Sequence, residues 1–283
     1  MPDPFDKIEK LGNSLIQHGP SNSRIYLMKA DERDLPSLPE ELEALALKDG
    51  YTKIFAKVPE RMRSDFEEYG YDQEASIPKF YRGDEDASFL GRYLSEDRMV
   101  EKEPDLVEDV LKVAQEKARP EIELATLPDG YGLTELGPDE AGMMSELYRT
   151  VFESYPFPIH DPGYLRETMQ THIRYFGVLA GDRLLAVSSA EMDRQGRNAE
   201  MTDFATHPDA RGQGLALYLL AEMEQAMRGE KILTPYTIAR AYSHGMNITF
   251  ARAGYLYGGT LTNNTQISGR IESMNVWYKH LSG

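Results

Sequence analysis

The chain has 283 residues, of which 41% are hydrophobic and 28% charged, a composition typical of one large globular domain or two of ordinary size. Asp and Glu outnumber Lys and Arg by 47 to 31, which gives a net charge of −16. This balance argues against nucleic acid and anionic membranes as partners, because both require basic surface. Most of the acidic excess lies before Leu127, so the C-terminal half is better suited to an anionic ligand.

Cysteine is absent, which excludes disulfides, thiolate metal sites and an acyl-enzyme formed on cysteine. The six histidines contain no His-x-x-x-His pair on a helix, so we expect no metal site. No apolar run approaches the length of a membrane span, and the first residues lack an apolar signal core. We therefore expect a soluble, cytoplasmic protein.

Hydrophobic periodicity predicts the elements of the first part of the chain. They are a loop over 31–39, a helix over 40–47, a strand over 51–58 and a helix over 60–68 that ends at Gly70. Residues 103–119 follow helical spacing, with Pro104 in the first turn and Pro120 directly after the last. They predict a linker helix, so we divide the chain into an N-terminal α/β domain (1–102), a linker (103–126) and a second domain (127–283).

The second domain has the pattern of a mixed α/β sheet. Its expected elements are a helix over 139–152, a Pro-rich loop over 155–162, a hairpin of strands 175–180 and 184–191, a strand over 200–206, a helix over 214–227, a strand over 236–241, a helix over 245–253 and two final strands over 255–262 and 272–279.

A faint repeat links the two domains. The segment from Ile54 to Tyr71 resembles the segment from Ile238 to Tyr255, since both predict a strand, a helix, a Gly-Tyr pair and then a further strand. Chance similarity of two ordinary units is one interpretation. We favour the other, that the first domain is a degenerate copy of part of the second.

A tight turn with Arg211, Gly212 and Gly214 joins the strand over 200–206 to the next helix. Free N–H groups at a helix start bind phosphate, and glycines allow close approach. The turn is no Walker A loop, because no Gly-Lys-Ser/Thr follows, and Leu217 stands where a dinucleotide fold expects Gly or Ala. A helix start without a ligand is the remaining alternative.

The pattern Arg211-x-x-Gly214-x-Ala216 resembles motif A of the GNAT acetyltransferases, and the order of elements over 127–283 fits their fold. The resemblance implies acetyl-CoA as co-substrate. It further implies that the backbone of the turn holds the pyrophosphate, that a strand edge pairs with the pantetheine arm and that an asparagine hydrogen-bonds this arm. The residues concerned are Arg211, Gly212, Gln213, Gly214, Leu215 and Ala216 in the turn, Phe204, Ala205 and Thr206 on the edge, and Asn247.

Further segments are similar to the β-lysine N-acetyltransferases. They are Tyr155-Pro-Phe-Pro-Ile, Asn263-Asn-Thr-Gln-Ile-Ser-Gly, Glu272-Ser-Met-Asn-Val-Trp-Tyr-Lys and, in the first domain, Tyr51-Thr-Lys-Ile-Phe-Ala-Lys-Val. The resemblance implies transfer of an acetyl group from acetyl-CoA to the terminal amine of β-lysine, which gives a neutral compatible solute, without a metal.

Direct transfer to an amine needs a base for the ammonium, a polarised carbonyl and a proton for the leaving thiolate. Glu200 matches the position of the glutamate that serves as base in several GNAT enzymes, and Asp203 is the second candidate. Strand alternation places these two carboxylates on opposite faces. A solvated or salt-bridged strand carboxylate is the alternative for either.

The general acid is open, because Phe250 stands where many GNAT enzymes carry a tyrosine; Tyr242, Ser243 or a water could replace it. The acceptor needs a carboxylate or carbonyl cluster for its second ammonium, and Arg or amide donors for its carboxylate. Candidates from the loops are Tyr155, Phe157, Asn263, Asn264, Glu272 and Asn275, with Arg240 or Arg270 for the carboxylate.

Two other functions remain compatible with these residues. One is a GNAT enzyme for another small amine, and the other is a non-catalytic CoA-binding module, which the phenylalanine at position 250 motivates. We leave open whether the chain forms a homodimer.

Overall fold

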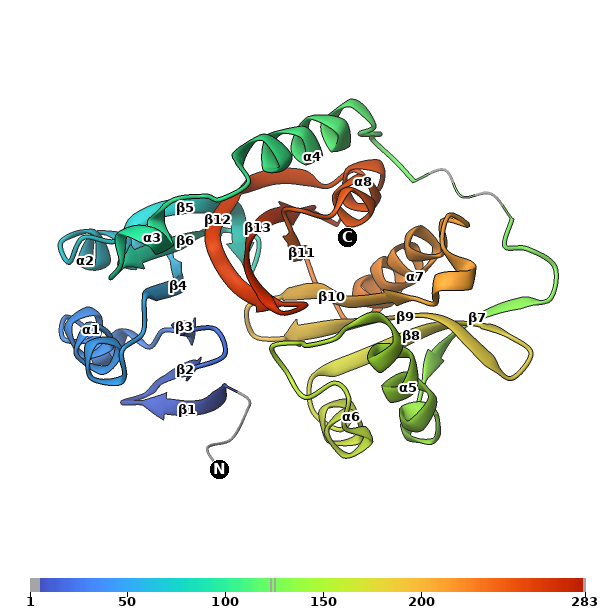
Figure 1. Ribbon diagram of the computed structural model, residues 1–283, viewed down its shortest axis with the longest axis horizontal. Helices are drawn as coiled ribbons and strands as arrows, with labels where there is room; N and C mark the ends of the chain where they lie inside the picture. The colour runs from blue at the N-terminus through green and yellow to red at the C-terminus, as the bar shows by residue number, and fades with distance from the viewer. Residues whose placement is uncertain (1–5, 123, 125, 282–283) are drawn as a thin grey trace.

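The computed structural model describes residues 6–122, 124 and 126–281, so residues 1–5, which bear on the expected lack of a signal segment, lie outside it. The described residues form one mixed sheet of 13 strands, in the order β1-β2-β3-β4-β6-β5-β12-β13-β11-β10-β9-β8-β7 (Figure 1). This confirms the expected mixed α/β fold.

The N-terminal half supplies one end of the sheet. Its elements are β1 (Lys7–Leu11), β2 (Ser14–Gly19), β3 (Arg24–Lys29), η1 (Glu32–Asp34), α1 (Leu38–Asp49), β4 (Lys53–Pro59), η2 (Glu60–Met62), α2 (Arg63–Glu67), β5 (Asp72–Tyr81) and β6 (Glu85–Tyr93). Two helices, α3 (Glu96–Met99) and α4 (Pro104–Glu116), lead to the second half. The first three strands and β6 were not predicted from the sequence, whereas β5 is the strand expected after Tyr71.

The C-terminal half supplies the other end. Its elements are β7 (Tyr131–Leu136), η3 (Pro138–Glu140), α5 (Ala141–Val151), α6 (Pro162–Met169), β8 (Ile173–Ala180), β9 (Arg183–Asp193), β10 (Asn198–Thr206), η4 (Pro208–Ala210), α7 (Leu215–Gly229), β11 (Thr234–Arg240), α8 (His244–Arg252), β12 (Leu256–Ile267) and β13 (Arg270–Tyr278). Helix α6 and strand β7 are additions to the predicted set. Within the described residues, no helix is long and apolar enough to cross a membrane.

The two halves repeat one topology. In each, three antiparallel strands lead through a helix to a strand parallel to the third, and a second helix leads to a hairpin. The last strand of each hairpin pairs with the parallel strand, giving β4-β6-β5 in one half and β11-β13-β12 in the other. This repeat supports duplication over chance similarity. The domain boundaries at 102 and 126 stay a prediction.

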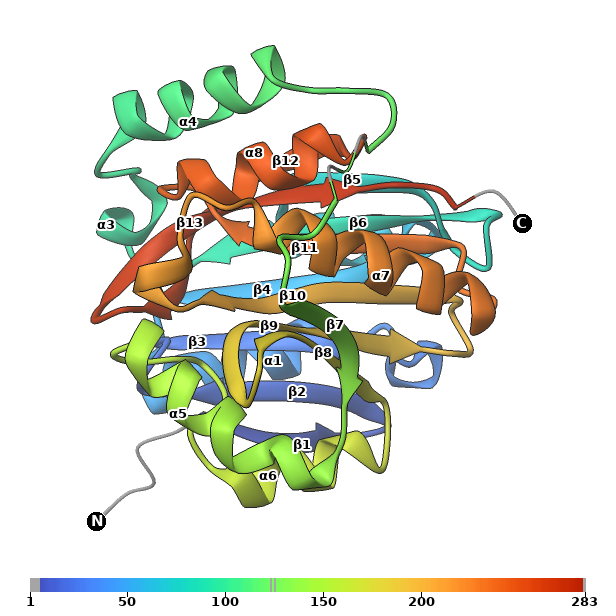
Figure 2. The ribbon, with the colours of Figure 1, turned by 90° about the vertical axis from the view of Figure 1, so that its right-hand side faces the viewer.

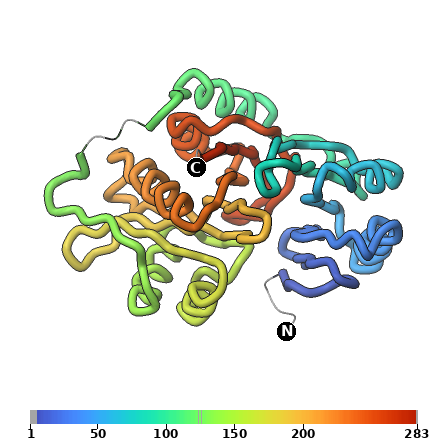
Figure 3. Tube along the Cα trace, turned by 180° about the vertical axis from the view of Figure 1, so that it is seen from behind, coloured from blue at the N-terminus to red at the C-terminus, as the bar shows by residue number. Residues whose placement is uncertain are grey.

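Strands β12 and β5 join the halves, and the pairing of Gly259 with Ala75 makes the sheet continuous. Figure 3 shows β12 and β13 between the N-terminal strands and the rest of the C-terminal half. Helices α7 and α8 cover one core of the C-terminal half. Helices α5 and α6 cover another core, and Figure 2 shows these two helices on the opposite side of the molecule from α4 and α8. A further core consists of apolar side chains on β3–β6 and β11–β13 and so includes residues of both halves.

We predict that Gly259→Ala strongly destabilises the protein. A Cβ at this position would lie 2.3 Å from the backbone oxygen of Glu74, at a φ of +141° that side chains rarely adopt. The expected loss is several kcal/mol in the free energy of unfolding, measured by thermal or urea denaturation. Gly269→Ala is the control, because a Cβ there meets no atom within 4 Å at a φ of +82°, so only about 1 kcal/mol of strain is expected. Equal losses would contradict the prediction.

Candidate active site

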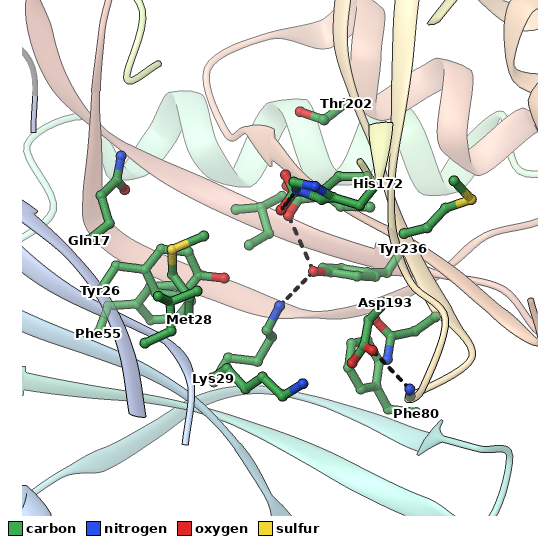
Figure 4. Close-up of a pocket in the computed structure, with 18 of the residues that line it drawn as sticks. Gln17, Tyr26, Met28, Lys29, Phe55, Phe80, His172, Asp193, Thr202 and Tyr236 are labelled. Carbon is green, nitrogen blue, oxygen red and sulfur yellow. Dashed lines mark hydrogen bonds and ion pairs between the residues drawn. The ribbon is translucent and has the colours of Figure 1, made fainter. Parts of the chain in front are cut away.

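A cavity of about 950 Å³ lies between the two halves. Side chains of β2, β3 and β4 line it from the N-terminal half, and side chains of β9, β10 and β11 from the C-terminal half (Figure 4). Such a volume is typical of a site for a small molecule. The role of the N-terminal half is therefore to form part of this wall.

Glu200 of β10 lines the cavity and belongs to a hydrogen-bonded chain that crosses between the halves. Lys57 Nζ donates to the hydroxyl of Tyr236 at 2.8 Å, and this hydroxyl donates to Glu200 Oε2 at 3.2 Å, as the two dashed lines at Tyr236 in Figure 4 mark. Burial, together with the nearby Glu191, raises the pKa of Glu200 to about 7. A carboxyl with this pKa can accept a proton near neutral pH.

Asp203 lies in the same cavity wall, so the expectation that Glu200 and Asp203 occupy opposite faces is wrong. The register between β10 and β9 shifts between Thr202 and Ala205, and Asp203 has a φ of +54°. This bulge interrupts the alternation of side chains and turns Asp203 to the face of Glu200. The carboxylate of Asp203 accepts from Tyr155 Oη at 2.6 Å and from Ser189 Oγ at 2.5 Å.

Three buried cations from the N-terminal part of the chain converge on a bulge of β12. Lys53 Nζ donates to the carbonyl of Thr262 at 2.7 Å, Arg98 Nε to that of Asn263 at 2.6 Å, and Arg24 Nη1 to that of Asn264 at 2.6 Å. Lys53 pairs with Glu74 at 2.7 Å, whereas Arg24 and Arg98 pair with no carboxylate among the residues described. Of the three cations, Arg24 lines the cavity.

The predicted acceptor residues divide into two groups. Tyr155, Phe157 and Asn264 line the cavity. The other three do not, because each side chain is buried and bonded elsewhere, so we do not retain them as acceptor contacts. Asn263 donates to the carbonyls of Arg98 and Val100, Asn275 contacts Asn247 and Thr260, and Glu272 pairs with Arg240 and Arg270.

The assignment of Arg240 or Arg270 to the acceptor carboxylate is not retained either. Arg240 forms two hydrogen bonds with Glu272, at 2.8 and 2.6 Å, and Arg270 Nε donates to the same carboxylate at 2.8 Å. Neither arginine lines the large cavity. Both are held by one fully buried carboxylate, that of Glu272.

The glycine turn begins α7 beside a gap in the sheet. Strand β10 pairs with β11 only through Asn198, Ala199 and Glu200, so residues 201–206, including Phe204, Ala205 and Thr206, keep one strand edge unpaired. Gly212 and Gly214 have φ values of +80° and +72°, and a Cβ on either would meet no atom within 4 Å. Open space thus faces the free N–H groups of the first helical turn, Leu215 and Ala216 included, as a bound pyrophosphate requires.

The side-chain amide of Asn247 is not free to donate a hydrogen bond to a ligand. Its Nδ2 donates to the carbonyls of Arg240 and Ser243, and its Oδ1 accepts from Asn275 and Trp277. The side chain is fully buried and engaged, so its assignment to the pantetheine arm is not supported by the structure. Phe250 is fully buried as well and packs edge-on against Phe204.

The hydroxyl of Tyr242, a candidate for the general acid, donates to Glu101 and does not line the large cavity. Ser243 precedes α8 as its N-cap residue and is also outside the lining. Neither residue faces Glu200 across the cavity, so the structure offers no support for either as the acid.

A second cavity, of about 380 Å³, lies against the first turn of α7. Its walls carry three cations, Lys117, Arg119 and Arg252, together with Glu121, Leu217 and Ile248. Within the described ranges, none of the three cations forms a salt bridge with a carboxylate. This concentration of positive charge in an acidic protein suits a phosphate group next to the glycine turn. A search of the described residues found no group of three or more His, Asp or Glu side chains arranged for a metal ion.

Comparisons with known proteins agree with this geometry. The model of the Acetyltransferase (GNAT) family matches residues 143–255. The chain is 38% identical over 276 residues to a β-lysine N(6)-acetyltransferase of Methanococcus maripaludis, covering 97% of this chain and 99% of that protein. The chain belongs to the GNAT acetyltransferase family. It is an N-acetyltransferase of this family.

Another relative of this GNAT enzyme, a β-lysine N(6)-acetyltransferase of Methanosarcina mazei, is 32% identical over 259 residues, with 85% of this chain and 95% of that protein covered. Among solved structures, a probable acetyltransferase from Staphylococcus epidermidis matches with a TM-score of 0.47 and 13% identity. The match covers 54% of this chain and 99% of that chain.

Several residues of the site were not predicted from the sequence: Lys57, Tyr236, Arg24 and Glu191 in the large cavity, and Lys117, Arg119 and Arg252 in the second. Lys57 lies four residues after Lys53 within a strand of otherwise apolar character, and two lysines in a buried strand are a usable signal. Tyr236 is the first residue of a predicted strand, but nothing in the sequence indicates its contact with Lys57. Arg24 lies on a strand that the sequence pattern did not reveal.

We predict that Glu200→Gln lowers kcat by roughly 10²–10³-fold, because the variant lacks a group that accepts a proton. In the wild type, kcat should rise with pH through about 7, where the carboxyl loses its proton. The inflection should vanish in the variant, as steady-state rates between pH 5.5 and 9 would show. An unchanged profile would exclude Glu200 as the base.

The same substitution should stabilise the fold at high pH. The pKa of Glu200 is raised from 4.5 to about 7 in the folded state, so the wild type loses stability as pH rises through this interval. At pH 8 the variant should gain up to about 3 kcal/mol in the free energy of unfolding, and near pH 4 almost none. A variant that is more stable yet slower cannot owe its slowness to misfolding. Glu191→Gln should shift the inflection of the rate profile to lower pH, because it removes a nearby negative charge that raises the pKa of Glu200.

Proposed function

We propose that this enzyme transfers the acetyl group of acetyl-CoA to the terminal amine of β-lysine and forms N(6)-acetyl-β-lysine. The observation that carries the proposal is the similarity, over nearly the whole chain, to proteins named for this reaction, including one at 38% identity. The charged groups of the cavity support it. Glu200, Glu191 and Asp203 suit ammonium groups, and Arg24 suits a carboxylate.

In this proposal Glu200 is the general base and acts directly or through a water. It accepts a proton from the terminal ammonium and leaves a neutral amine. Tyr236 and Lys57 hold its carboxylate in place. Acetyl-CoA supplies the thioester: the amine nitrogen bonds to the carbonyl carbon, the carbon–sulfur bond breaks, and the nitrogen loses one further proton, which balances the proton that the leaving thiolate takes up.

In this proposal transfer is direct, in a ternary complex, and the absence of cysteine removes the thiol that could carry the acetyl group. Asp203 is the second carboxylate of the site; it is bonded to Tyr155 and Ser189 and positions the wall near the amine. Initial-rate plots against both substrates should give intersecting lines. Parallel lines would indicate an acetylated enzyme and contradict direct transfer.

The co-substrate is held, in this proposal, by the backbone from Arg211 to Ala216 and by the unpaired edge from Phe204 to Thr206. The cations of the second cavity, Lys117, Arg119 and Arg252, bind its phosphates. This local arrangement explains how an enzyme with a net charge of −16 binds an anionic co-substrate.

We predict that Arg119→Gln and Arg252→Gln each raise the KM for acetyl-CoA about 3- to 10-fold, because each removes one cation from a phosphate. The kcat and the KM for the amine should stay within twofold. Lys112→Gln is the control, because Lys112 is an exposed cation of α4 outside the cavity. Equal KM values in all three variants would refute this phosphate site.

The proposed physiological role is synthesis of a compatible solute in the cytoplasm. β-Lysine carries two ammonium groups and one carboxylate near neutral pH, so acetylation of one amine leaves a zwitterion without net charge. A solute of this kind can accumulate without a counter-ion.

The acceptor assignment is tested by following thiol release with acetyl-CoA and three amines, which are β-lysine, α-lysine and spermidine. The kcat/KM for β-lysine should exceed the others at least about tenfold. Mass spectrometry of the product should place the acetyl group on the terminal nitrogen. A higher kcat/KM with α-lysine or spermidine would retain the enzyme class and overturn the acceptor.

A further inference from the structure

Arg24 is a buried cation for which the fold supplies no carboxylate. The side chain is 4% exposed, and no Asp or Glu of the described residues lies within salt-bridge distance of it. Its Nη1 donates to the carbonyl of Asn264 at 2.6 Å and to Thr265 Oγ1 at 3.1 Å. A buried charge is normally paired, because the loss of hydration costs several kcal/mol.

The neighbouring charges increase this imbalance. Arg24, Lys53 and Arg98 bind consecutive carbonyls of the β12 bulge, and Glu74 forms the one salt bridge of the group among the residues described. Since Lys53 and Arg98 do not line the cavity, Arg24 presents the excess positive charge to it. An anion in the cavity would complete the group.

Asn264 lies next to this guanidinium, and its amide is only half satisfied, because Nδ2 donates to Thr265 Oγ1 at 3.4 Å whereas the oxygen accepts no hydrogen bond among the residues described. Its side chain lines the cavity and is 1% exposed, and its Oδ1 is buried without a partner in the described part of the chain. An unpaired buried acceptor is destabilising unless a ligand supplies a donor. The donor that suits a carbonyl oxygen most strongly is an ammonium group.

The two groups are adjacent, since Arg24 binds the backbone carbonyl of Asn264 itself. They therefore suit a ligand that carries a carboxylate and an ammonium close together. The ring of Tyr26 links this region to the proposed base, because Arg24 lies 5.5 Å and Lys57 6.0 Å from its centroid. From Lys57 the hydrogen bonds through Tyr236 lead to Glu200. The rings of Tyr26 and Phe55 are stacked and form an apolar wall of the cavity (Figure 4).

We propose that Arg24 and Asn264 bind the β-amino acid head of the acceptor. Arg24 holds the carboxylate, Asn264 Oδ1 accepts from the β-ammonium, and the alkyl chain extends along Tyr26 so that the terminal amine reaches Glu200. The N-terminal half thus selects the acceptor and decides which of its two amines is acetylated. This inference rests on the proposed function.

The test uses three acceptors that share the terminal amine. β-Lysine has both head groups, 6-aminohexanoate lacks the β-amine, and pentane-1,4-diamine lacks the carboxylate. For Arg24→Gln, kcat/KM should fall about 100-fold with β-lysine and 6-aminohexanoate and less than about threefold with pentane-1,4-diamine. For Asn264→Leu, kcat/KM should fall about 10-fold with β-lysine and pentane-1,4-diamine, and stay unchanged with 6-aminohexanoate.

Arg98→Gln is the matched control. It removes an equally buried arginine that also binds a carbonyl of the bulge but does not line the cavity. Its activity should change by the same factor with all three acceptors. Retained turnover of pentane-1,4-diamine shows that Arg24→Gln folds, and Arg24→Lys, which keeps a charge, should recover part of the activity with β-lysine.

Equal losses with all three acceptors in Arg24→Gln would overturn the inference, because they would mark Arg24 as a structural residue like Arg98. This result differs from failure of the proposed function. In that case the wild-type enzyme itself would not prefer β-lysine to α-lysine or spermidine.

Discussion

Strands β10 and β11 part after only three paired positions, and the rest of the site depends on this separation. Glu200 and Tyr236 form the last pair, so their side chains lie where the two strands diverge. The bulge at Asp203 turns β10 further and adds a carboxylate to the same face. The unpaired edge beyond Glu200 opens toward the glycine turn of α7. One interruption of backbone pairing thus creates both the edge that we propose for the co-substrate and the position of the proposed base.

The N-terminal half has the same topology, and its corresponding strands pair over a similar length. Strands β3 and β4 pair at four positions, from Arg24↔Lys53 through Leu27↔Ala56, and β3 then continues only to Lys29. The connection to α1 contains Pro36 and no glycine, and Pro39, Glu40 and Glu41 lie in the first turn of the helix. Prolines lack N–H donors, and these carboxylates repel an anion. The first turn of α1 is therefore unsuited to an anion, and strands of the N-terminal half instead provide side chains to the wall of the shared cavity.

The distribution of charge inside the molecule matters more for recognition than its total. An acidic surface is combined with cations in the second cavity and on the β12 bulge. The carboxylates of Glu200, Glu191 and Asp203 lie in another part of the large cavity. Charges of opposite sign in one enclosed space suit a zwitterionic or amino acid ligand, because electrostatic interactions are strong where water is excluded.

The sequence by itself determined the features that depend on neighbours along the chain. Helices such as α4 and α7, the strand of Glu200 and the glycine turn follow from periodicity, Pro and Gly placement and local N–H geometry. The tertiary structure decided which side chains share a space. A bulge brought Asp203 beside Glu200, long-range bonds engaged Asn247, Asn263, Glu272 and Asn275, and strands remote in sequence placed Arg24 and Lys57 in the cavity. Pairing register and bulges arise from contacts across the sheet, which no local pattern encodes.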